Sequence, residues 1–323
     1  MIPGHQKGQN LRILVLAGGI SHERDISLKS GRRVADALTD AGATVIIREP
    51  DENLFTHIAE DAPDVIWPTL HGASGEDGAL RDILGLTSVP FVGAAADGAR
   101  LAWDKSIAKI IAARTGLQTP ASVTLPKDTF RELDAESVLA QVAKHMSFPV
   151  VVKPARSGSA QGVTIVEDAT HLSRAMIDAY VYCDVAIIEK FVAGTELAVT
   201  VINQGGGLLA LPAVEIEATG GRFGYDERVT AGEVNYFVPA RLDQQILDRA
   251  GKIAVQIHEE LGLRHISRVD LIVDENGVAW FLEVNVAPGL TETSLAPQAI
   301  LATGATLSDV YLGIAEAARL GRG

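Results

Sequence analysis

The sequence predicts an α/β protein that begins with a parallel sheet and ends with an antiparallel hairpin. An apolar stretch at 11–16, a helical pattern from about 26 to 41 and a second apolar stretch at 44–47 form a βαβ unit. A third apolar stretch follows at 64–70. Near the C-terminus, two stretches rich in β-branched and aromatic residues flank a turn signal at 274–277. At 323 residues, the chain is long enough for two or three domains.

The composition limits the partners and the compartment. The formal net charge is −13, so the surface as a whole should repel nucleic acid and anionic membranes. The single cysteine, Cys183, excludes an internal disulfide and suits a reducing cytoplasm. No apolar run reaches the roughly 18–20 residues of a membrane helix. Residues 1–10 are polar and lack the apolar core of a signal peptide, so we expect a disordered tail there.

Two glycine-containing motifs mark the N-terminal region. Gly18 and Gly19 follow the first predicted strand, where glycines allow a ligand to approach a helix N-terminus. Glu23 follows them, and it is either a ligand-binding group or an ordinary first-turn carboxylate favoured by the helix dipole. The sequence HGASGEDG at 71–78 predicts a turn before another helix. Local sequence alone favours a structural role for His71. The N-terminal domain is expected to end near residue 100.

The middle of the chain contains a lysine in a setting that suits phosphate. Lys105 lies at the start of a predicted helix that ends near 116, and no local pattern assigns this lysine a function. A second, amphipathic helix is predicted over 127–146. An apolar strand at 148–152 runs into Lys153, and a loop of small residues at 155–162 leads into another strand. Ammonium and backbone N–H groups together suit phosphate oxygens. The loop lacks the P-loop pattern, and a mobile surface hairpin is the alternative.

The C-terminal hairpin concentrates polar side chains on one face. With Asn276 and Gly277 at the centre of a type I′ turn, Asp270 faces Glu283 and residue 268 faces residue 285. Two carboxylates opposite each other repel unless a cation lies between them. Oxygen ligands indicate a hard cation, Mg²⁺ or Mn²⁺, completed by substrate phosphates. The alternative is an exposed strand face whose charges are only solvated.

Several motifs resemble the D-alanine–D-alanine ligase family of the ATP-grasp superfamily. They are RVD at 268–270, LEVN at 282–285, APGLT at 287–291, SLAP at 294–297, HGASGEDG at 71–78 and YFVPA at 236–240. The resemblance extends from residue 11 to about 318. It implies a three-domain ATP-grasp architecture, with an N-terminal Rossmann-like substrate domain at 11–100. A central subdomain at 101–212 and a C-terminal subdomain at 213–323, both α+β, would clasp ATP.

The resemblance implies that ATP phosphorylates the carboxylate of one D-alanine and that the amine of a second attacks the acyl phosphate. The product, D-alanyl-D-alanine, serves peptidoglycan synthesis. The nucleotide-binding residues would be Lys105, Lys153, Glu189, Lys190, Phe191, Val192, Glu196 and Arg228. The residues at the amino acids and the reacting carbonyl would be Glu23, Ser159, His71, Ser294, Leu295, Arg268 and the backbone N–H of Gly289. Two Mg²⁺ or Mn²⁺ ions would be held by Asp270, Glu283 and Asn285. We expect amino acids and ATP as small-molecule partners, and a homodimer.

The loop at 220–240 departs from the family. Arg228 and Val229 stand where the family commonly has lysine and tyrosine, and valine has no hydroxyl to hydrogen-bond. Ala160 also replaces a common serine, whereas Tyr225 could supply a hydroxyl from nearby. We therefore expect weak loop closure, with modest D-alanine dimerisation or a shifted substrate preference. The alternatives are the same chemistry on other amino or hydroxy acids, and a nucleotide-binding protein without turnover.

Overall fold

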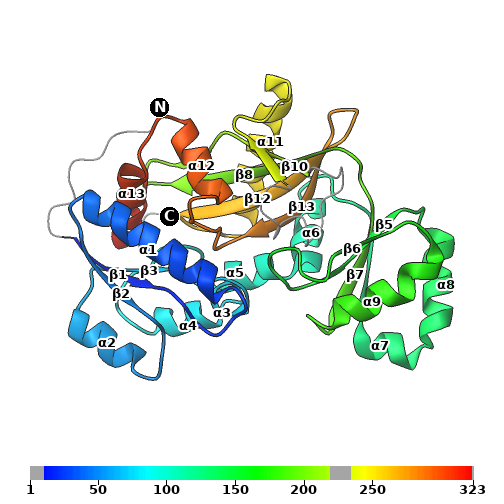
Figure 1. Ribbon diagram of the computed structural model, residues 1–323, viewed down its shortest axis with the longest axis horizontal. Coiled ribbons are helices and arrows are strands. Elements are labelled where there is room, and N and C mark those ends of the chain that lie inside the picture. Colours follow the sequence, from blue (N-terminus) through cyan, green and yellow to red (C-terminus); the bar gives the residue numbers. More distant parts are fainter. Residues whose placement is uncertain (1–10, 219–233, 322–323) are drawn as a thin grey trace.

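The computed structural model describes residues 11–218 and 234–321, which form three sheets with helices packed around them (Figure 1). A parallel three-stranded sheet lies at one end of the molecule and an antiparallel four-stranded sheet at the other. A six-stranded sheet lies between them (Figure 1). Along the described parts of the chain, no helix is both long enough and apolar enough to cross a membrane.

The N-terminal sheet confirms the predicted βαβ opening. Its strands are in the order β2-β1-β3 and run parallel. Leu14 and Leu16 of the central strand pack into one apolar cluster, and Ile13 and Val15 pack into another, so both faces are covered. The elements of this region are β1 (Arg12–Leu16), α1 (Arg24–Asp40), β2 (Thr44–Arg48), α2 (Leu54–Asp61), β3 (Val65–Pro68), α3 (Ala73–Glu76), α4 (Ala79–Gly85) and α5 (Ala96–Trp103).

The four-stranded sheet has the order β4-β7-β5-β6, with antiparallel neighbours. The single helix predicted over 127–146 is wrong, because the structure has two helices there. Asp134 separates them with a φ of 62°, and its side chain accepts a 3.1 Å hydrogen bond from Ser137 N–H to cap the second helix. The elements are β4 (Ser122–Pro126), α7 (Lys127–Glu132), α8 (Ala135–His145), β5 (Val150–Pro154), β6 (Thr164–Val166), η1 (Ala169–His171), α9 (Leu172–Tyr180) and β7 (Val185–Lys190).

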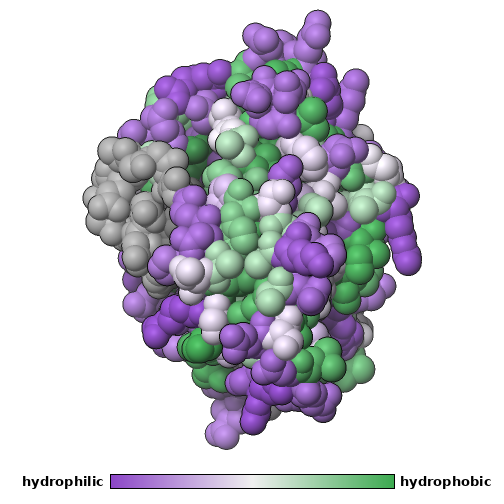
Figure 2. Space-filling model, turned by 90° about the vertical axis from the view of Figure 1, so that its right-hand side faces the viewer, coloured by the Kyte–Doolittle hydropathy of each residue, from purple (hydrophilic) through white to green (hydrophobic). Residues whose placement is uncertain are grey.

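Apolar side chains reach the surface at this end of the molecule. Figure 2 views the molecule from this side and shows a band of apolar residues between polar ones. Large apolar side chains exposed in the four-stranded unit include Leu133, Ile177, Val181 and Tyr182. The unit therefore buries its core on the inner faces of its helices and leaves several apolar groups outside.

The six-stranded sheet has the order β11-β10-β8-β12-β13, with β9 paired to β8. The long helix α11 packs against this sheet through Ala250, Ala254 and Ile257, which are all fully buried in one apolar cluster with residues of β8. The elements are α6 (Lys105–Arg114), β8 (Thr195–Asn203), β9 (Leu208–Ala210), β10 (Val214–Ala218), β11 (Val234–Phe237), α11 (Gln244–Glu260), β12 (Ile266–Val273), β13 (Ala279–Asn285), α12 (Leu295–Ala302) and α13 (Leu307–Arg319).

The sheets do not divide the chain at residue 212, where the central subdomain was expected to end. Strands β8 and β9 precede that position but belong to the six-stranded sheet. The chain instead crosses between the two antiparallel sheets over residues 191–194. Helix α13 ties the six-stranded sheet to the N-terminal one, because Tyr311 packs in the same buried cluster as Trp67 and Ile266.

The hairpin of β12 and β13 confirms the predicted pairs, since Arg268 faces Asn285 and Asp270 faces Glu283. The predicted type I′ turn is wrong. Gly277 N–H bonds to the carbonyl of Asp274 at 2.9 Å, and Gly277 has a positive φ of 72° whereas Asn276 does not. The turn is therefore centred on 275–276. A bulge between Asp270 and Leu271 then moves the register by one residue and restores the predicted pairs.

Candidate active site

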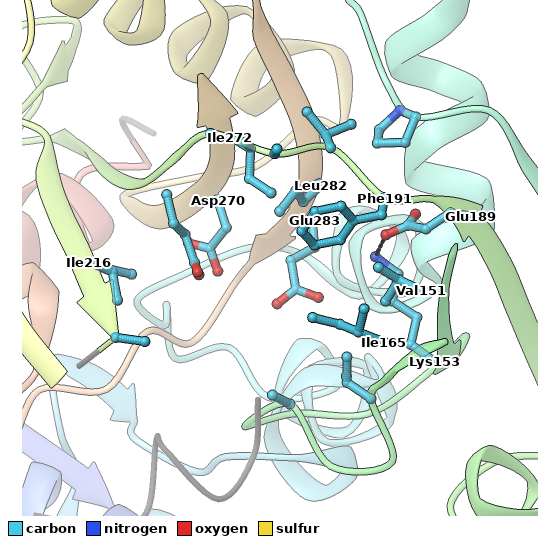
Figure 3. Close-up of a pocket in the computed structure, with 18 of the residues that line it drawn as sticks. Val151, Lys153, Ile165, Glu189, Phe191, Ile216, Asp270, Ile272, Leu282 and Glu283 are labelled. Atoms are coloured by element: carbon cyan, nitrogen blue, oxygen red, sulfur yellow. Dashed lines mark hydrogen bonds and ion pairs between the residues drawn. The ribbon is translucent and has the colours of Figure 1, made fainter. Parts of the chain in front are cut away.

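A cavity of about 520 Å³ lies between the four-stranded and six-stranded sheets (Figure 3). Side chains from both sheets point into it, so it depends on the way the two sheets face each other. The sequence-predicted residues that line it are Lys105, Lys153, Glu189, Lys190, Phe191, Val192, Glu196, Asp270 and Glu283. The fold thus brings seven of the eight predicted nucleotide residues together with two of the three predicted metal ligands.

A buried charge triad lies at one wall of this cavity, which two of its members, Lys153 and Glu189, line. One oxygen of the Glu189 carboxylate lies 2.5 Å from the ammonium of Lys153 (Figure 3). The other oxygen lies 2.5 Å from the ammonium of Lys109. Burial alone would raise the pKa of Glu189, but the two lysines hold it below its usual value. Burial also lowers the pKa of Lys109. With both lysines charged, the triad carries one net positive charge, which suits an anionic ligand.

Lys105 connects the loop after β5 to the hairpin face. Its ammonium donates a 2.6 Å hydrogen bond to the carbonyl of Ser157 and lies 3.2 Å from an oxygen of Glu283. Asp104 caps helix α6 by accepting from the backbone N–H of Ser106, which fixes the start of the helix that carries Lys105. Two lysines from different elements therefore reach the same cavity.

The hairpin face carries an arginine–carboxylate pair. The Arg268 guanidinium donates two 2.8 Å hydrogen bonds to the Asp270 carboxylate, and both side chains are largely buried. Burial alone would lower the pKa of Arg268, but Asp270 on the same strand and nearby Glu283 raise it, so the guanidinium stays charged. Arg268 thus holds a fixed positive charge beside the carboxylates.

The donors on this face fit a hard divalent cation. Asp270 and Glu283 face each other across the strands, and Asn285 adds an amide oxygen on the same face. In the described ranges, no three His, Cys, Asp or Glu side chains gather closely enough to hold a metal by themselves. Mg²⁺ usually takes one or two carboxylates and completes its shell with water and substrate phosphates. Two carboxylates beside two lysines therefore fit a metal that arrives with a polyphosphate.

A second cavity, of about 890 Å³, lies between the N-terminal region and the hairpin. Asp270 lines both cavities, so they meet at the hairpin face. The Ser159 hydroxyl donates a short hydrogen bond to Glu23, which joins the loop after β5 to the N-terminal region. The predicted residues that line the second cavity are Glu23, His71, Ser159, Arg268, Asp270, Asn285, Gly289, Ser294 and Leu295.

The segment after β13 forms part of the wall of the second cavity. Gly289 lies so close to Ser294 that a Cβ atom on it would be 2.8 Å from the serine hydroxyl. Ser294 in turn accepts a 3.0 Å hydrogen bond from Thr291 N–H. Leu295 begins helix α12, so its backbone N–H has no carbonyl partner within the helix. Unpaired N–H groups at a helix N-terminus suit a carboxylate.

His71 lies at the base of the second cavity, with only 4% of its surface exposed. Its Nδ1 is 2.9 Å from the carbonyl oxygen of Ala287, and its Nε2 is 3.2 Å from the hydroxyl of Ser30. Burial lowers the pKa of His71. Both ring nitrogens contact protein atoms, so the ring touches the segment after β13 and leaves neither nitrogen free for a substrate.

A family model described as the D-ala D-ala ligase C-terminus matches residues 111–314, which is more than half of the chain. The chain belongs to the D-alanine–D-alanine ligase family. Among its relatives, the D-alanine–D-alanine ligase of Desulforudis audaxviator is 37% identical over 93% of this chain and 95% of its own length. That of Bordetella petrii is 34% identical over 94% of this chain and 90% of its own.

Solved structures of this ligase family share the fold. The VanG D-Ala:D-Ser ligase of Enterococcus faecalis has a TM-score of 0.80 and 27% identity, covering 95% of this chain and 98% of its own. The D-alanine–D-alanine ligase of Bacillus anthracis complexed with ATP has a TM-score of 0.78 and 26% identity, covering 96% of this chain and 98% of its own. The three-domain ATP-grasp architecture of the family therefore describes this chain.

Three buried groups of this chain were not predicted from the sequence. They are Lys109 in the charge triad, Ser30 beside His71, and Glu76. Burial, with a contribution from the charge of Glu23, raises the pKa of Glu76 to about 8. A lysine, a serine and a glutamate in helical patterns look ordinary in a sequence, and only the HGASGEDG motif around Glu76 gave a signal.

Part of the predicted site lies outside the described residues. Arg228, expected at the nucleotide, falls within 219–233, and so do Val229 and Tyr225. Ala160, in the loop after β5, has a positive φ of 56° and lines the first cavity. The consequences expected from Val229 thus remain predictions from the sequence.

Proposed function

We propose that the protein is an ATP-dependent ligase that joins two D-alanine molecules through an acyl phosphate. The observation that carries this proposal is the meeting of two cavities at Asp270. One holds lysines and carboxylates suited to a metal-bound polyphosphate, and the other holds groups suited to zwitterionic amino acids. Membership of the family and a relative complexed with ATP support the same reading.

In the first cavity, Lys105 and Lys153 would bind the phosphates of ATP as point charges. The segment 190–192 would contact the adenine, and Glu196 the ribose. Glu189 would act through its two lysines, because its carboxylate oxygens both bond to them. The support for this arrangement is that all of these residues line one cavity.

Mg²⁺ would be held by Asp270, Glu283 and Asn285, and a second ion would share the carboxylates. When bound, the metal supplies positive charge that neutralises the phosphates. Arg268 already neutralises Asp270 in part through its two hydrogen bonds. The donor chemistry of the hairpin face and the family's use of ATP support this assignment.

In the second cavity, Glu23 and Ser159 would orient the ammonium of the first D-alanine so that its carboxylate faces the phosphates. A carboxylate oxygen attacks the γ-phosphorus, the bond to the bridging oxygen of ADP breaks, and an acyl phosphate forms. Ser294 and Leu295 would hold the carboxylate of the second D-alanine.

The deprotonated amine of the second D-alanine then attacks the acyl carbon, and the carbonyl oxygen becomes negatively charged. Arg268 and the N–H of Gly289 would stabilise that oxygen, as an oxyanion hole does. The tetrahedral intermediate collapses with loss of inorganic phosphate and of one of the two amine protons, and the other stays as the amide N–H. The products are D-alanyl-D-alanine, ADP and phosphate.

The test is an assay of ADP release coupled to mass analysis of the product, with Mg²⁺, ATP and a panel of D-alanine, D-serine and D-lactate. Formation of D-alanyl-D-alanine is the expected result. A mixed product made preferentially with D-serine or D-lactate would support the alternative substrates, in line with Val229. Nucleotide binding without ADP release on any substrate would contradict the ligase proposal.

We also propose Mg²⁺ as the ion used, a cytoplasmic location and a homodimer. The single cysteine, the nucleotide substrate and the resemblance to the family support these three statements. Light scattering of the purified protein tests the dimer, and replacement of Mg²⁺ by Ca²⁺ in the ADP assay tests the ion.

A further inference from the structure

Two side chains of the N-terminal region hydrogen-bond to the backbone of the segment that carries Gly289. Leu290 N–H donates a 3.1 Å hydrogen bond to the Ser30 hydroxyl, and His71 Nδ1 lies 2.9 Å from the Ala287 carbonyl. The Ser30 hydroxyl and His71 Nε2 are 3.2 Å apart. These contacts link positions 260, 216 and 41 residues apart. Four groups thus form a ring, here called the 287–290 clamp, which joins the N-terminal region to the segment after β13.

The chemistry of the groups fixes the direction of each hydrogen bond. The Ala287 carbonyl can only accept, so His71 Nδ1 must carry a proton. Leu290 N–H can only donate, so the Ser30 oxygen accepts from it. Because burial lowers the pKa of His71, the ring is neutral and its Nε2 accepts from the Ser30 hydroxyl. Each polar group of the clamp then has a partner, which buried polar groups require.

Ser30 cannot touch a substrate. It is fully buried on helix α1 and does not line the second cavity. Any effect of Ser30 on the reaction must therefore pass through Leu290 and His71 to the segment between them. Gly289 lies within that segment, and its contact with Ser294 limits movement on the other side.

We propose that Ser30 is a positioning residue for the ligase reaction. Through the 287–290 clamp, it sets where the N–H of Gly289 points when charge develops on the reacting carbonyl oxygen. This proposal rests on the proposed function. Oxyanion donors act through placement, and a displacement of about 1 Å can lower a rate by about 10²-fold.

The test is Ser30→Ala, which leaves Leu290 N–H and His71 Nε2 without their partner. We expect kcat for ADP release to fall by about 10- to 100-fold. The KM for ATP should change by less than about threefold, because no clamp residue lines the nucleotide cavity. Hydrogen exchange of the Leu290 amide should accelerate in the absence of substrates, which reports on the clamp without turnover.

Ser27→Ala is the matched control. Ser27 lies on the same helix, is also fully buried, and accepts a 2.8 Å hydrogen bond from Gly18 N–H rather than from the 287–290 segment. Ser27→Ala should lose about as much thermal stability as Ser30→Ala. Hydrogen exchange of the Leu290 amide should stay unchanged in it, and kcat should fall less than in Ser30→Ala. In the double variant Ser30→Ala, His71→Gln, kcat should fall little further than in the more affected single variant, because both changes break the same ring.

The outcomes are distinguishable. Unchanged exchange at Leu290 in Ser30→Ala would overturn the clamp. Faster exchange with full kcat would overturn the positioning role, and so would an equal fall in kcat for Ser27→Ala. If the wild-type protein forms no dipeptide or mixed product, the proposed function fails and the positioning role fails with it, whereas the exchange result still reports whether the clamp exists.

Discussion

Replacing Arg268 by alanine should separate catalysis from nucleotide binding. The guanidinium is 14% exposed and donates two 2.8 Å hydrogen bonds to Asp270, whose side chain is 4% exposed. Its removal takes away the proposed oxyanion partner, and this should lower kcat by about 10²- to 10³-fold, which corresponds to about 2.7–4 kcal/mol of activation free energy. It also leaves Asp270 buried without a cation and opposite Glu283, and breaking such a pair costs about 3–5 kcal/mol of folding stability.

Three measurements test this prediction: kcat from ADP release at saturating D-alanine, nucleotide affinity from calorimetry, and stability from urea denaturation. Nucleotide affinity should change by less than about threefold, since Arg268 lines only the second cavity. Arg48→Ala is the control, because Arg48 makes a similar two-bond pair with Asp61 away from both cavities. An Arg268→Ala protein with full kcat and only weaker nucleotide binding would refute the assigned role.

Three further variants test the other charged groups. Glu283→Gln should lower Mg²⁺-dependent ATP turnover by about 10²-fold or more without changing thermal stability, and wild-type turnover would end the metal assignment. Glu189→Gln leaves Lys109 and Lys153 buried without a carboxylate and should lower the free energy of unfolding, measured by urea denaturation, by about 3–5 kcal/mol. Lys109→Met leaves one lysine paired with one carboxylate and should lower it clearly less. Equal losses of unfolding free energy in the two variants would contradict the triad. Because the pKa of Glu76 is raised to about 8, the stability it contributes is present below about pH 4.5 and is lost as the pH rises through 8. Glu76→Gln should therefore gain stability relative to the wild type by up to about 1.4 kcal/mol per pH unit between about pH 5 and 8, and identical pH profiles would rule this out.

The hairpin shows what a sequence can fix and what it cannot. Alternation placed Asp270 and Glu283 on one face, and the pairing followed from an assumed turn at Asn276 and Gly277. The actual turn is centred one residue earlier, and the bulge before Leu271 compensates. The correct pairing at the site thus came from two differences that cancel. Turn type and bulge position depend on packing, which a single sequence does not display.

The residues missed by the sequence analysis have distant partners. Lys109 reaches Glu189 across 80 positions, and Ser30 reaches Leu290 across 260. No local pattern marks either residue, because each lies in an ordinary amphipathic helix. Motifs predicted His71 near the site, but only the structure shows that both of its ring nitrogens hold protein groups. The motifs therefore indicated the location of the site, whereas the contacts that support it required the fold.

The most direct test of the central claim follows one oxygen atom. If the carboxylate of the first D-alanine attacks the γ-phosphorus, that carboxylate oxygen leaves with the phosphate in the second step. D-Alanine labelled with ¹⁸O in both carboxylate oxygens should therefore yield one ¹⁸O in each released phosphate, in equal amounts with ADP and D-alanyl-D-alanine. Released phosphate without ¹⁸O would mean that water, rather than the amino acid, attacks ATP, and would contradict the acyl phosphate mechanism.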